Sequence, residues 1–368
     1  MSAPHHSRPA VLDLFAGAGG LGLGLTWAGF RVQAANEYEP VFAATYALNH
    51  SETAVVAGDV LDPTVRAALL AAAQGVDLVA GGPPCQGFST VGKKDEDDPR
   101  NKLFYAFLEI VGALKPRAVL FENVSGFRRM YGGRAFQALY RGLEDLGYPA
   151  LHCDILNAVE YGVPQSRQRT FVVAFRENAA FRFPAPTHGE PDKLFRAKPP
   201  LTLDEALSDL PAVRSGESSD RYRSPPQNDY QAFMRTGAGE TLTEHDGPWH
   251  GERLLAVLAQ VPPGGTILDV PENLRPRSCF ANTYARLWAD RPSTTITRNF
   301  GTPSSSRCIH PRADRGLTTR EGARLQSFPD SYQFTGTRIR KNLQIGNAVP
   351  PLLARALGQE IFRALVDT

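Results

Sequence analysis

Short apolar runs alternate with amphipathic stretches along roughly the first half of the chain. The runs have the length and apolar content of buried strands, and the stretches between them have apolar residues at helical spacing. Alternation of strand and helix predicts a parallel, doubly wound α/β sheet with helices on both faces. The expected strands are 11–15, 31–37, 54–60, 76–82, 118–124 and 169–175, and helical segments between them include 21–29, 40–50 and 103–115.

The pattern changes at about Phe183, where proline, glycine and serine become frequent and the apolar runs become short and poorly periodic. Such a texture predicts a second domain of irregular or β-rich build. Helical patterning returns at 319–328 and 349–366.

Composition fits a globular chain of two modest domains: 368 residues, 42% hydrophobic and 21% charged. No apolar run reaches the roughly 20 residues that span a bilayer, and the N-terminus does not have the pattern of a signal peptide. The four cysteines, Cys85, Cys153, Cys279 and Cys308, are far apart and lack metal-ligand spacing. We therefore expect a reduced, cytosolic protein without a metal site.

The formal net charge of +2 conceals an uneven distribution. Residues 190–273 hold 8 Lys/Arg against 14 Asp/Glu, whereas residues 274–341 hold 13 against 4. A local basic stretch of this kind can supply contacts to phosphate, although a solvated arginine-rich surface is the ordinary alternative.

The segment DLFAGAGGLGLGL at 13–25 follows the first expected strand and opens a helix. Its glycines let the backbone approach a ligand at the helix N-terminus, although a nucleotide-binding turn of another kind or a tight structural turn would also fit. The next two strands end near Glu37 and Asp59, and an acid at the end of the second strand is placed to bind ribose hydroxyls. Together these strand ends predict a nucleoside cofactor, and the missing Walker lysine argues against a triphosphate.

The segment GGPPCQGFS at 81–89 places Cys85 in a loop at the end of the fourth expected strand. A buried structural cysteine is the usual alternative to a reactive one. The fifth strand ends in FENV, which puts Glu122 on the neighbouring strand end. The alternation in QSRQR at 165–169 can aim Arg167 and Arg169 at one side of a strand. A nucleophile, a protonatable carboxylate and two guanidinium groups would then form one pocket.

At these residues the sequence resembles the cytosine-5 DNA methyltransferase family, of the bacterial restriction-modification type. The resemblance covers the glycine-rich segment, PPCQGFS, ENV, QxRxR, RPSTTITRNFGTP at 291–303 and IGNAVPP at 345–351, in the family's order. It implies a doubly wound mixed sheet of the Rossmann-like methyltransferase type and a smaller target-recognition domain. The large domain would comprise 1–186 and 316–368, and the small domain 187–315.

The resemblance implies covalent catalysis on a cytosine that is flipped out of duplex DNA. The Cys85 thiolate would attack carbon 6 while Glu122 hydrogen-bonds or protonates N3, and carbon 5 would then take the methyl group. Arg169 would hold the base O2, and Arg167 would orient the pocket or lower the pKa of the cysteine. The implied enzyme is a DNA (cytosine-5-)-methyltransferase.

The implied cofactor is S-adenosylmethionine. Phe15 would pack near the adenine, Tyr38 would stack on it, and Asp59 would bind its amino group. Glu37 would bind the ribose hydroxyls. The whole implied site comprises Phe15, Ala16, Gly17, Gly19, Gly20, Leu21, Glu37, Tyr38, Asp59, Val60, Pro83, Leu103, Asn347 and Ala348.

Double-stranded DNA is the implied partner. The segment at 90–102 resembles a loop that closes over DNA, with Lys93 and Lys94 as candidate phosphate contacts, although a charge run is more often a solvated face. We expect a monomer in the bacterial cytoplasm, at the nucleoid, and whether a cognate restriction endonuclease or defence system is a partner stays open. Candidate base or phosphate contacts in the variable region are Arg221, Arg223, Arg235 and Arg253.

Three alternatives remain at this point. An RNA cytosine-5 methyltransferase would use the same scaffold, but PPCQGFS and the long variable region with its TITR element favour DNA. An amino-group methyltransferase needs a different loop motif, which Cys85 and Glu122 argue against. A DNA-binding regulator with an inactive site would not need the complete set of catalytic elements found here.

Overall fold

The computed structural model describes residues 8–84, 101–190, 197–277 and 280–367. The chain divides into two compact units. Unit 1 comprises residues 1–157, 168–185 and 353–368, and unit 2 comprises 158–167 and 186–352. The expected division differs at residues 158–167, 186 and 316–352, which the sequence analysis assigned to the large domain and which group with unit 2 in the structure.

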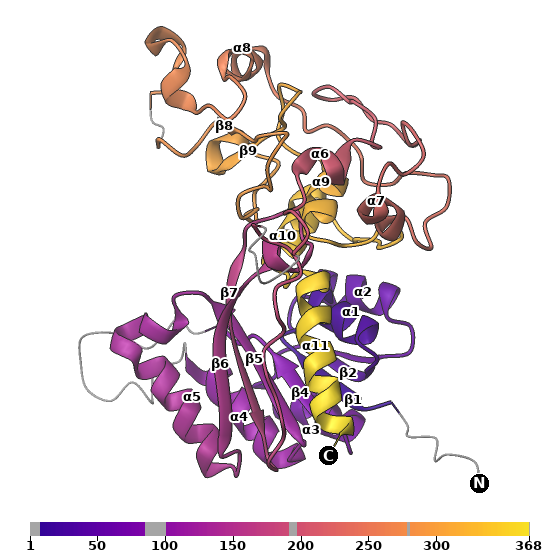
Figure 1. Cartoon of the computed structure of the whole chain (residues 1–368), viewed down its shortest axis with the longest axis vertical. Helices are drawn as coiled ribbons and strands as arrows, with labels where there is room; N and C mark the ends of the chain where they lie inside the picture. Colours follow the sequence, from indigo (N-terminus) through magenta and orange to yellow (C-terminus); the bar gives the residue numbers. More distant parts are fainter. Residues whose placement is uncertain (1–7, 85–100, 191–196, 278–279, 368) are drawn as a thin grey trace. The chain divides into compact units, whose positions relative to one another are not determined.

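Unit 1 is built on one seven-stranded sheet with the strand order β3-β2-β1-β4-β5-β7-β6 (Figure 1). Neighbouring strands from β3 to β5 are parallel, whereas β7 is antiparallel to both β5 and β6. The mixed, doubly wound α/β sheet that the resemblance implies is therefore confirmed, whereas the parallel sheet predicted from the alternation of strands and helices is wrong at β7. Its strands are β1 (Ala10–Leu14), β2 (Arg31–Glu37), β3 (Ala54–Ala57), β4 (Leu78–Gly81), β5 (Ala118–Val124), β6 (Ala150–Asn157) and β7 (Gln168–Phe175).

The degree to which each strand is buried explains which strands could be predicted from the sequence. Every residue of β1 and of β4 is buried, because helices cover both faces of the centre of the sheet, and such strands appear as continuous apolar runs. The sequence analysis did not predict β6. It is the edge strand next to β7, and Leu156 is its only buried residue, so it lacks an apolar run.

Helices of unit 1 cover both faces of the sheet (Figure 1). On one face, Leu69, Phe107 and Leu139 of three helices share a core with strand residues such as Leu12 and Val119. The helices of this face are α3 (Pro63–Ala72), α4 (Lys102–Leu114) and α5 (Arg134–Asp145). The opposite face is covered by α1 (Gly20–Trp27), α2 (Pro40–Asn49) and α11 (Pro351–Val366).

The C-terminal helix α11 packs closely against α1. A Cβ at Gly358 would lie only 2.8 Å from the Cβ of Ala28, so glycine is required for this approach. The Phe362 ring meets Phe30 edge-on, with 5.4 Å between ring centroids. These contacts pack helix α11 against unit 1.

Unit 2 consists of short helices and a small sheet joined by long irregular segments (Figure 1). The helix expected at 319–328 begins at Thr319 and ends at Leu325. Thr318 and Glu321 form a reciprocal capping box at its start. The helices are α6 (Leu203–Leu207), α7 (Asp229–Met234), α8 (Glu252–Gln260), α9 (Thr319–Leu325) and α10 (Arg338–Asn347), and the sheet pairs β8 (Ala285–Arg286) with β9 (Arg307–Ile309) in parallel. Short 3-10 turns lie at Phe127–Gly133 in unit 1 and at Ala158–Tyr161, Ile267–Asp269, Glu272–Leu274 and Pro303–Ser305 in unit 2.

A buried arginine joins three segments of unit 2. All five N–H groups of Arg324 donate hydrogen bonds: two to Asp209, two to Asp330 and one to the Ala206 carbonyl, at 2.7–3.0 Å. Arg324 and both carboxylates are almost completely buried. A guanidinium group has five donors in a rigid plane, so this arrangement uses its full hydrogen-bonding capacity.

Candidate active site

The predicted site residues of unit 1 follow the carboxyl ends of neighbouring strands, β3-β2-β1-β4-β5. In an open parallel sheet this edge is where ligands bind. Phe15–Leu21 follow β1, Glu37 ends β2 and Tyr38 follows it, Asp59 and Val60 follow β3, Pro83 follows β4 and Glu122 lies near the end of β5. Leu103 lies in the first turn of α4, half-buried against the core of unit 1.

The glycine-rich turn has a left-handed backbone at three positions. Phe15, Gly17 and Gly19 have φ values of 55°, 56° and 89°, which glycine adopts without strain and phenylalanine rarely adopts. A Cβ at Gly17 would meet nothing within 4 Å, so the turn has open space beside it. The Gly17 N–H donates to Glu37 Oε2 at 2.7 Å, which links the turn to the end of β2.

The carboxylates of β2 and β3 are oriented by backbone groups. Glu37 Oε1 also accepts from the Glu39 N–H at 2.9 Å, and burial raises the pKa of this carboxyl above its usual value. Asp59 Oδ1 accepts from the Leu61 N–H at 2.9 Å. The Tyr38 side chain is 64% exposed, which leaves its ring available to a ligand.

Glu122 and Arg169 form an ion pair on β5 and β7. Arg169 Nε lies 3.0 Å from Glu122 Oε1, and the two side chains are only 16% and 15% exposed. The antiparallel register pairs Arg169 with Val124, two residues from Glu122, so the two side chains lie on the same face. A Cβ at Gly82 would lie 2.6 Å from Glu122 Oε2, so the start of the GGPPC segment passes directly over this carboxylate.

The predicted nucleophile Cys85 lies outside the described residues, as do Lys93 and Lys94. The described chain ahead of Cys85 is fixed by Asn123, whose Nδ2 donates to the Pro83 carbonyl at 3.0 Å. The segment that leads to Cys85 is therefore tied to the residue next to Glu122.

Three predicted site residues, Arg167, Asn347 and Ala348, belong to unit 2. Arg167 is buried, and its guanidinium donates to the Ile296 carbonyl at 3.2 Å and to the Gly346 carbonyl at 2.8 Å. It thereby joins the RPSTTIT and IGNAVPP segments. Asn347 is exposed, and the Ala348 carbonyl accepts from Gln326.

Four of the 13 basic residues at 274–341 lie inside unit 2 and do not form a phosphate-binding surface. Arg286, Arg315, Arg320 and Arg324 are all buried and donate to carboxylates, carbonyls or hydroxyls of unit 2. The expectation that the charge excess supplies phosphate contacts is wrong for these four residues, because sequence charge does not distinguish an internal guanidinium from a surface one.

The candidate DNA-contacting arginines have different environments. Arg221, Arg223 and Arg253 are exposed. Arg235 stacks on the Tyr222 ring, 3.6 Å from its centroid, and its guanidinium lies 3.4 Å from Asp209. Arg235 is therefore engaged in the buried charge network of unit 2.

Sequence reasoning missed Asp13, which lies in β1 directly ahead of the glycine-rich turn. Asp13 is fully buried, and burial raises the pKa of its carboxyl to about 7. The signal was present in the sequence: VLDLF places a single acid in the middle of an otherwise apolar strand.

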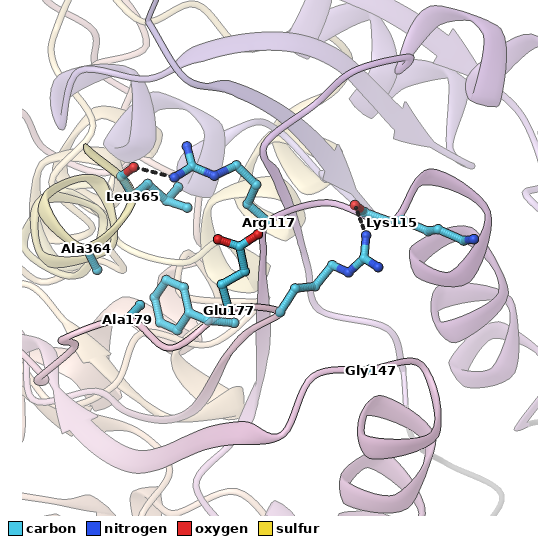
Figure 2. Close-up of a pocket in the computed structure, with 9 residues that line it drawn as sticks. Lys115, Arg117, Gly147, Glu177, Ala179, Ala364 and Leu365 are labelled. Atoms are coloured by element: carbon cyan, nitrogen blue, oxygen red, sulfur yellow. Dashed lines mark hydrogen bonds between the residues drawn. The ribbon is translucent and has the colours of Figure 1, made fainter. Parts of the chain in front are cut away.

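A cavity of about 280 Å³ lies at the opposite edge of the sheet, ahead of β5 (Figure 2). No predicted site residue lines it. Its guanidinium groups cap backbone carbonyls: Arg117 donates to Leu365 at 2.6 Å, and Arg176 donates to Lys115 at 3.2 Å. The arginines of this cavity therefore stabilise the C-terminal ends of helices α4 and α11.

Comparison with known proteins identifies the family. The family model for C-5 cytosine-specific DNA methylase matches residues 10–363. The chain belongs to this family. The predicted family and enzyme class, DNA (cytosine-5-)-methyltransferase, are thus confirmed.

The chain is similar to type II methyltransferases over nearly its whole length. It is 36% identical to M.AgeI of Thalassovita gelatinovora, with 96% of this chain and 99% of that protein covered. It is also 36% identical to M.DdeI of Desulfomicrobium norvegicum, with coverage of 95% and 88%.

Among solved structures, a DNA modification methyltransferase encoded within an E. coli prophage superimposes with a TM-score of 0.76. The two chains are 25% identical, and the match covers 98% of this chain and 100% of that one. Within the described part of this methylase, no helix is both long and apolar enough to cross a membrane.

Proposed function

We propose that this methylase transfers a methyl group from S-adenosylmethionine to carbon 5 of a cytosine in a specific duplex sequence, with Cys85 as the covalent nucleophile. The observation that carries the proposal is the largely buried Glu122–Arg169 pair beside the GGPPC segment. A carboxylate and a guanidinium at 3.0 Å offer a pyrimidine one group for N3 and another for O2.

In this mechanism the Cys85 sulfur bonds to carbon 6, and the electron pair of the 5,6 double bond moves toward N3. Glu122 holds or supplies the proton at N3, which makes the ring a better electron acceptor. Arg169 binds O2 and orients Glu122. Carbon 5 would then take the methyl group as the methyl–sulfur bond breaks and S-adenosylhomocysteine leaves. Transfer of the carbon 5 proton to a base such as water would expel the Cys85 thiolate and restore the ring.

The turn and strand ends of unit 1 fit S-adenosylmethionine, which supplies an electrophilic methyl group when bound. The open space beside Gly17 can receive the methionine moiety. Glu37 can accept bonds from ribose hydroxyls in addition to its two backbone N–H groups, because each carboxylate oxygen has two lone pairs. The exposed Tyr38 ring offers a stacking surface for adenine, and Asp59 an acceptor for its amino group.

Residues 187–315 form the proposed target-recognition region, and 1–186 with 316–368 form the proposed catalytic domain. Arg221, Arg223 and Arg253 are exposed and stay candidates for base or phosphate contacts. Lys93 and Lys94 are proposed phosphate contacts of the loop at 90–102. For Arg167, Asn347 and Ala348 we propose the site roles that the family resemblance implies; Arg167 joins the RPSTTIT and IGNAVPP segments through the Ile296 and Gly346 carbonyls.

The relatives are type II methyltransferases, which supports a role in restriction-modification. We propose that the chain acts as a monomer on nucleoid DNA in the bacterial cytoplasm, and that a cognate restriction endonuclease recognises the same sequence.

Two variants and two matched controls test the proposal in one assay, transfer of labelled methyl groups to duplex DNA. Cys85→Ser should abolish transfer, because a hydroxyl is far less ionised than a thiol. Glu122→Gln should lower kcat by about 10²–10⁴-fold while the cofactor Kd stays unchanged. The controls are Cys153→Ser, at a half-buried cysteine of β6, and Glu109→Gln, at a surface ion pair with Arg66.

Both controls should retain wild-type transfer. Turnover by Cys85→Ser above a few per cent of the wild-type rate would exclude the proposed nucleophile. Loss of activity in Cys153→Ser equal to that in Cys85→Ser would show that the effect is structural.

A further inference from the structure

A buried polar pair lies between β1, α1 and α2, next to the glycine-rich turn. Asp13 is 0% exposed, and its Oδ2 accepts from the Tyr46 hydroxyl at 3.1 Å. Its Oδ1 has no hydrogen-bond partner among the described residues. A carboxyl group held this way is costly to bury, so its place in the fold needs a physical reason.

Tyr46, which donates the hydrogen bond to Asp13, lies on α2. Tyr46 and His50 are four residues apart, and their rings stack with 4.3 Å between centroids. Burial lowers the pKa of His50 to about 4, and a hydrogen bond with the Gly19 backbone offsets part of that effect. His50 is therefore neutral near pH 7, and it contacts the turn itself.

The same pair sets how closely α1 approaches β1. A Cβ at Gly22, in the first turn of α1, would lie 2.3 Å from the Tyr46 hydroxyl and 2.8 Å from Asp13 Oδ2. Gly22 thus rests directly on the hydrogen bond between the two side chains. Since α1 begins where the turn ends, a shift of this pair moves the backbone of the turn.

We propose that the Asp13–Tyr46 pair is a positioning element for the cofactor, because it fixes the first turn of α1 against β1 and so shapes the turn at residues 15–19. Asp13 and Tyr46 act through the backbone of that turn and need not touch the cofactor themselves. The inference rests on the proposed binding of S-adenosylmethionine at this turn.

The test compares two buried tyrosines of unit 1 that each lose one hydroxyl. Tyr46→Phe removes the donor to Asp13, whereas Tyr148→Phe removes a donor to the Pro116 carbonyl, 2.7 Å away at the opposite edge of the sheet. By calorimetry, the Kd for S-adenosylmethionine should rise about tenfold in Tyr46→Phe and stay at the wild-type value in Tyr148→Phe. At saturating cofactor, kcat and the KM for DNA of Tyr46→Phe should stay within about twofold of wild type.

Rescue separates positioning from general damage. Asp13→Asn keeps an acceptor for the Tyr46 hydroxyl and should hold the cofactor Kd within about threefold of wild type, whereas Asp13→Val should match Tyr46→Phe. Unchanged cofactor affinity in Tyr46→Phe, or equal weakening in both phenylalanine variants, would overturn the inference. If wild-type protein with intact methyl transfer bound no S-adenosylmethionine, the proposed cofactor assignment itself would fail.

Discussion

Unit 1 and unit 2 both bury carboxyl groups but surround them with different donors. At the ligand edge of the unit 1 sheet, Asp13 and Glu37 accept hydrogen bonds from a tyrosine hydroxyl and from backbone N–H groups. In unit 2, the buried carboxylates of Glu321, Asp330 and Asp209 accept hydrogen bonds from buried arginine side chains.

The difference sets the protonation of each group. Burial raises the pKa of Asp13 to about 7 and raises that of Glu37. Burial acts in the same direction on Glu321 and Asp330, but Arg315 and Arg324 beside them lower both pKa values below the usual range. A guanidinium therefore reverses the effect that desolvation alone would have.

This contrast separates two uses of a buried charge. A carboxylate locked to arginine in fixed geometry joins segments, as Asp209 and Asp330 do around α9. Arginine also lowers the pKa values of Asp330 and Glu321, which keeps these two carboxylates ionised near pH 7.

A carboxyl group whose donors are neutral can gain or lose a proton near pH 7, and its hydrogen bonds are not locked to a fixed charge. Such a group is typical of a ligand-binding site. The two buried acids beside the glycine-rich turn, Asp13 and Glu37, are of this second kind, whereas Glu122 at the end of β5 is paired with Arg169.

The largest effect expected from this comparison is at Arg324. Arg324→Met should lower the free energy of unfolding by about 3–5 kcal/mol, because it leaves Asp209 and Asp330 buried without their main partner. Arg324→Lys should cost nearly as much, since an ammonium group cannot make five planar hydrogen bonds. Urea unfolding monitored by circular dichroism measures both, and a loss below about 1 kcal/mol would contradict a locking role.

A second effect is the pH dependence at Asp13. Its folded pKa is raised to about 7 from an ordinary value of 3.8, so its contribution to stability is full below the ordinary value and is lost as pH rises through 7. Asparagine does not titrate. The unfolding free energy of wild type minus that of Asp13→Asn should therefore fall by roughly 2–3 kcal/mol between about pH 5 and about pH 8.

The matched experiment in unit 2 uses Glu321→Gln and should give the opposite sign. The folded pKa of Glu321 lies below its ordinary value of 4.5, so its contribution is present above that value and is lost as pH falls. Differences of the same sign at Asp13 and Glu321 would show that the two kinds of environment are not distinct.

The burial of side chains also explains which parts of the fold and of the candidate site could be predicted from the sequence. Central strands such as β1 and β5 are predictable because all their buried positions except Asp13 are apolar. The glycine-rich turn is predictable because its backbone needs glycine. The edge strand β6 has no such pattern, since most of its side chains are only partly buried.

Side-chain partners are what the sequence could not supply. Arg169 and Arg167 are two residues apart in one motif, yet Arg169 pairs with Glu122 while Arg167 holds carbonyls at Ile296 and Gly346. Likewise, the arginines after residue 274 predict a basic surface only if they point outward. Burial depends on contacts between distant segments, which local spacing does not encode.

The smallest expected effect is at an exposed arginine, Arg363. It tests whether an ion pair must be buried to stabilise the fold. On α11, Arg363 Nη1 lies 2.6 Å from Glu360 Oε1, a distance shorter than those in the Arg324 network, but the Arg363 side chain is 64% exposed. Water screens such a pair, and holding two flexible side chains together costs entropy, so Arg363→Gln should change the unfolding free energy by less than about 0.5 kcal/mol. The same urea titration measures this change. A cost near that of Arg324→Met would mean that proximity of charges, rather than burial with complete hydrogen bonding, stabilises the ion pairs of this chain.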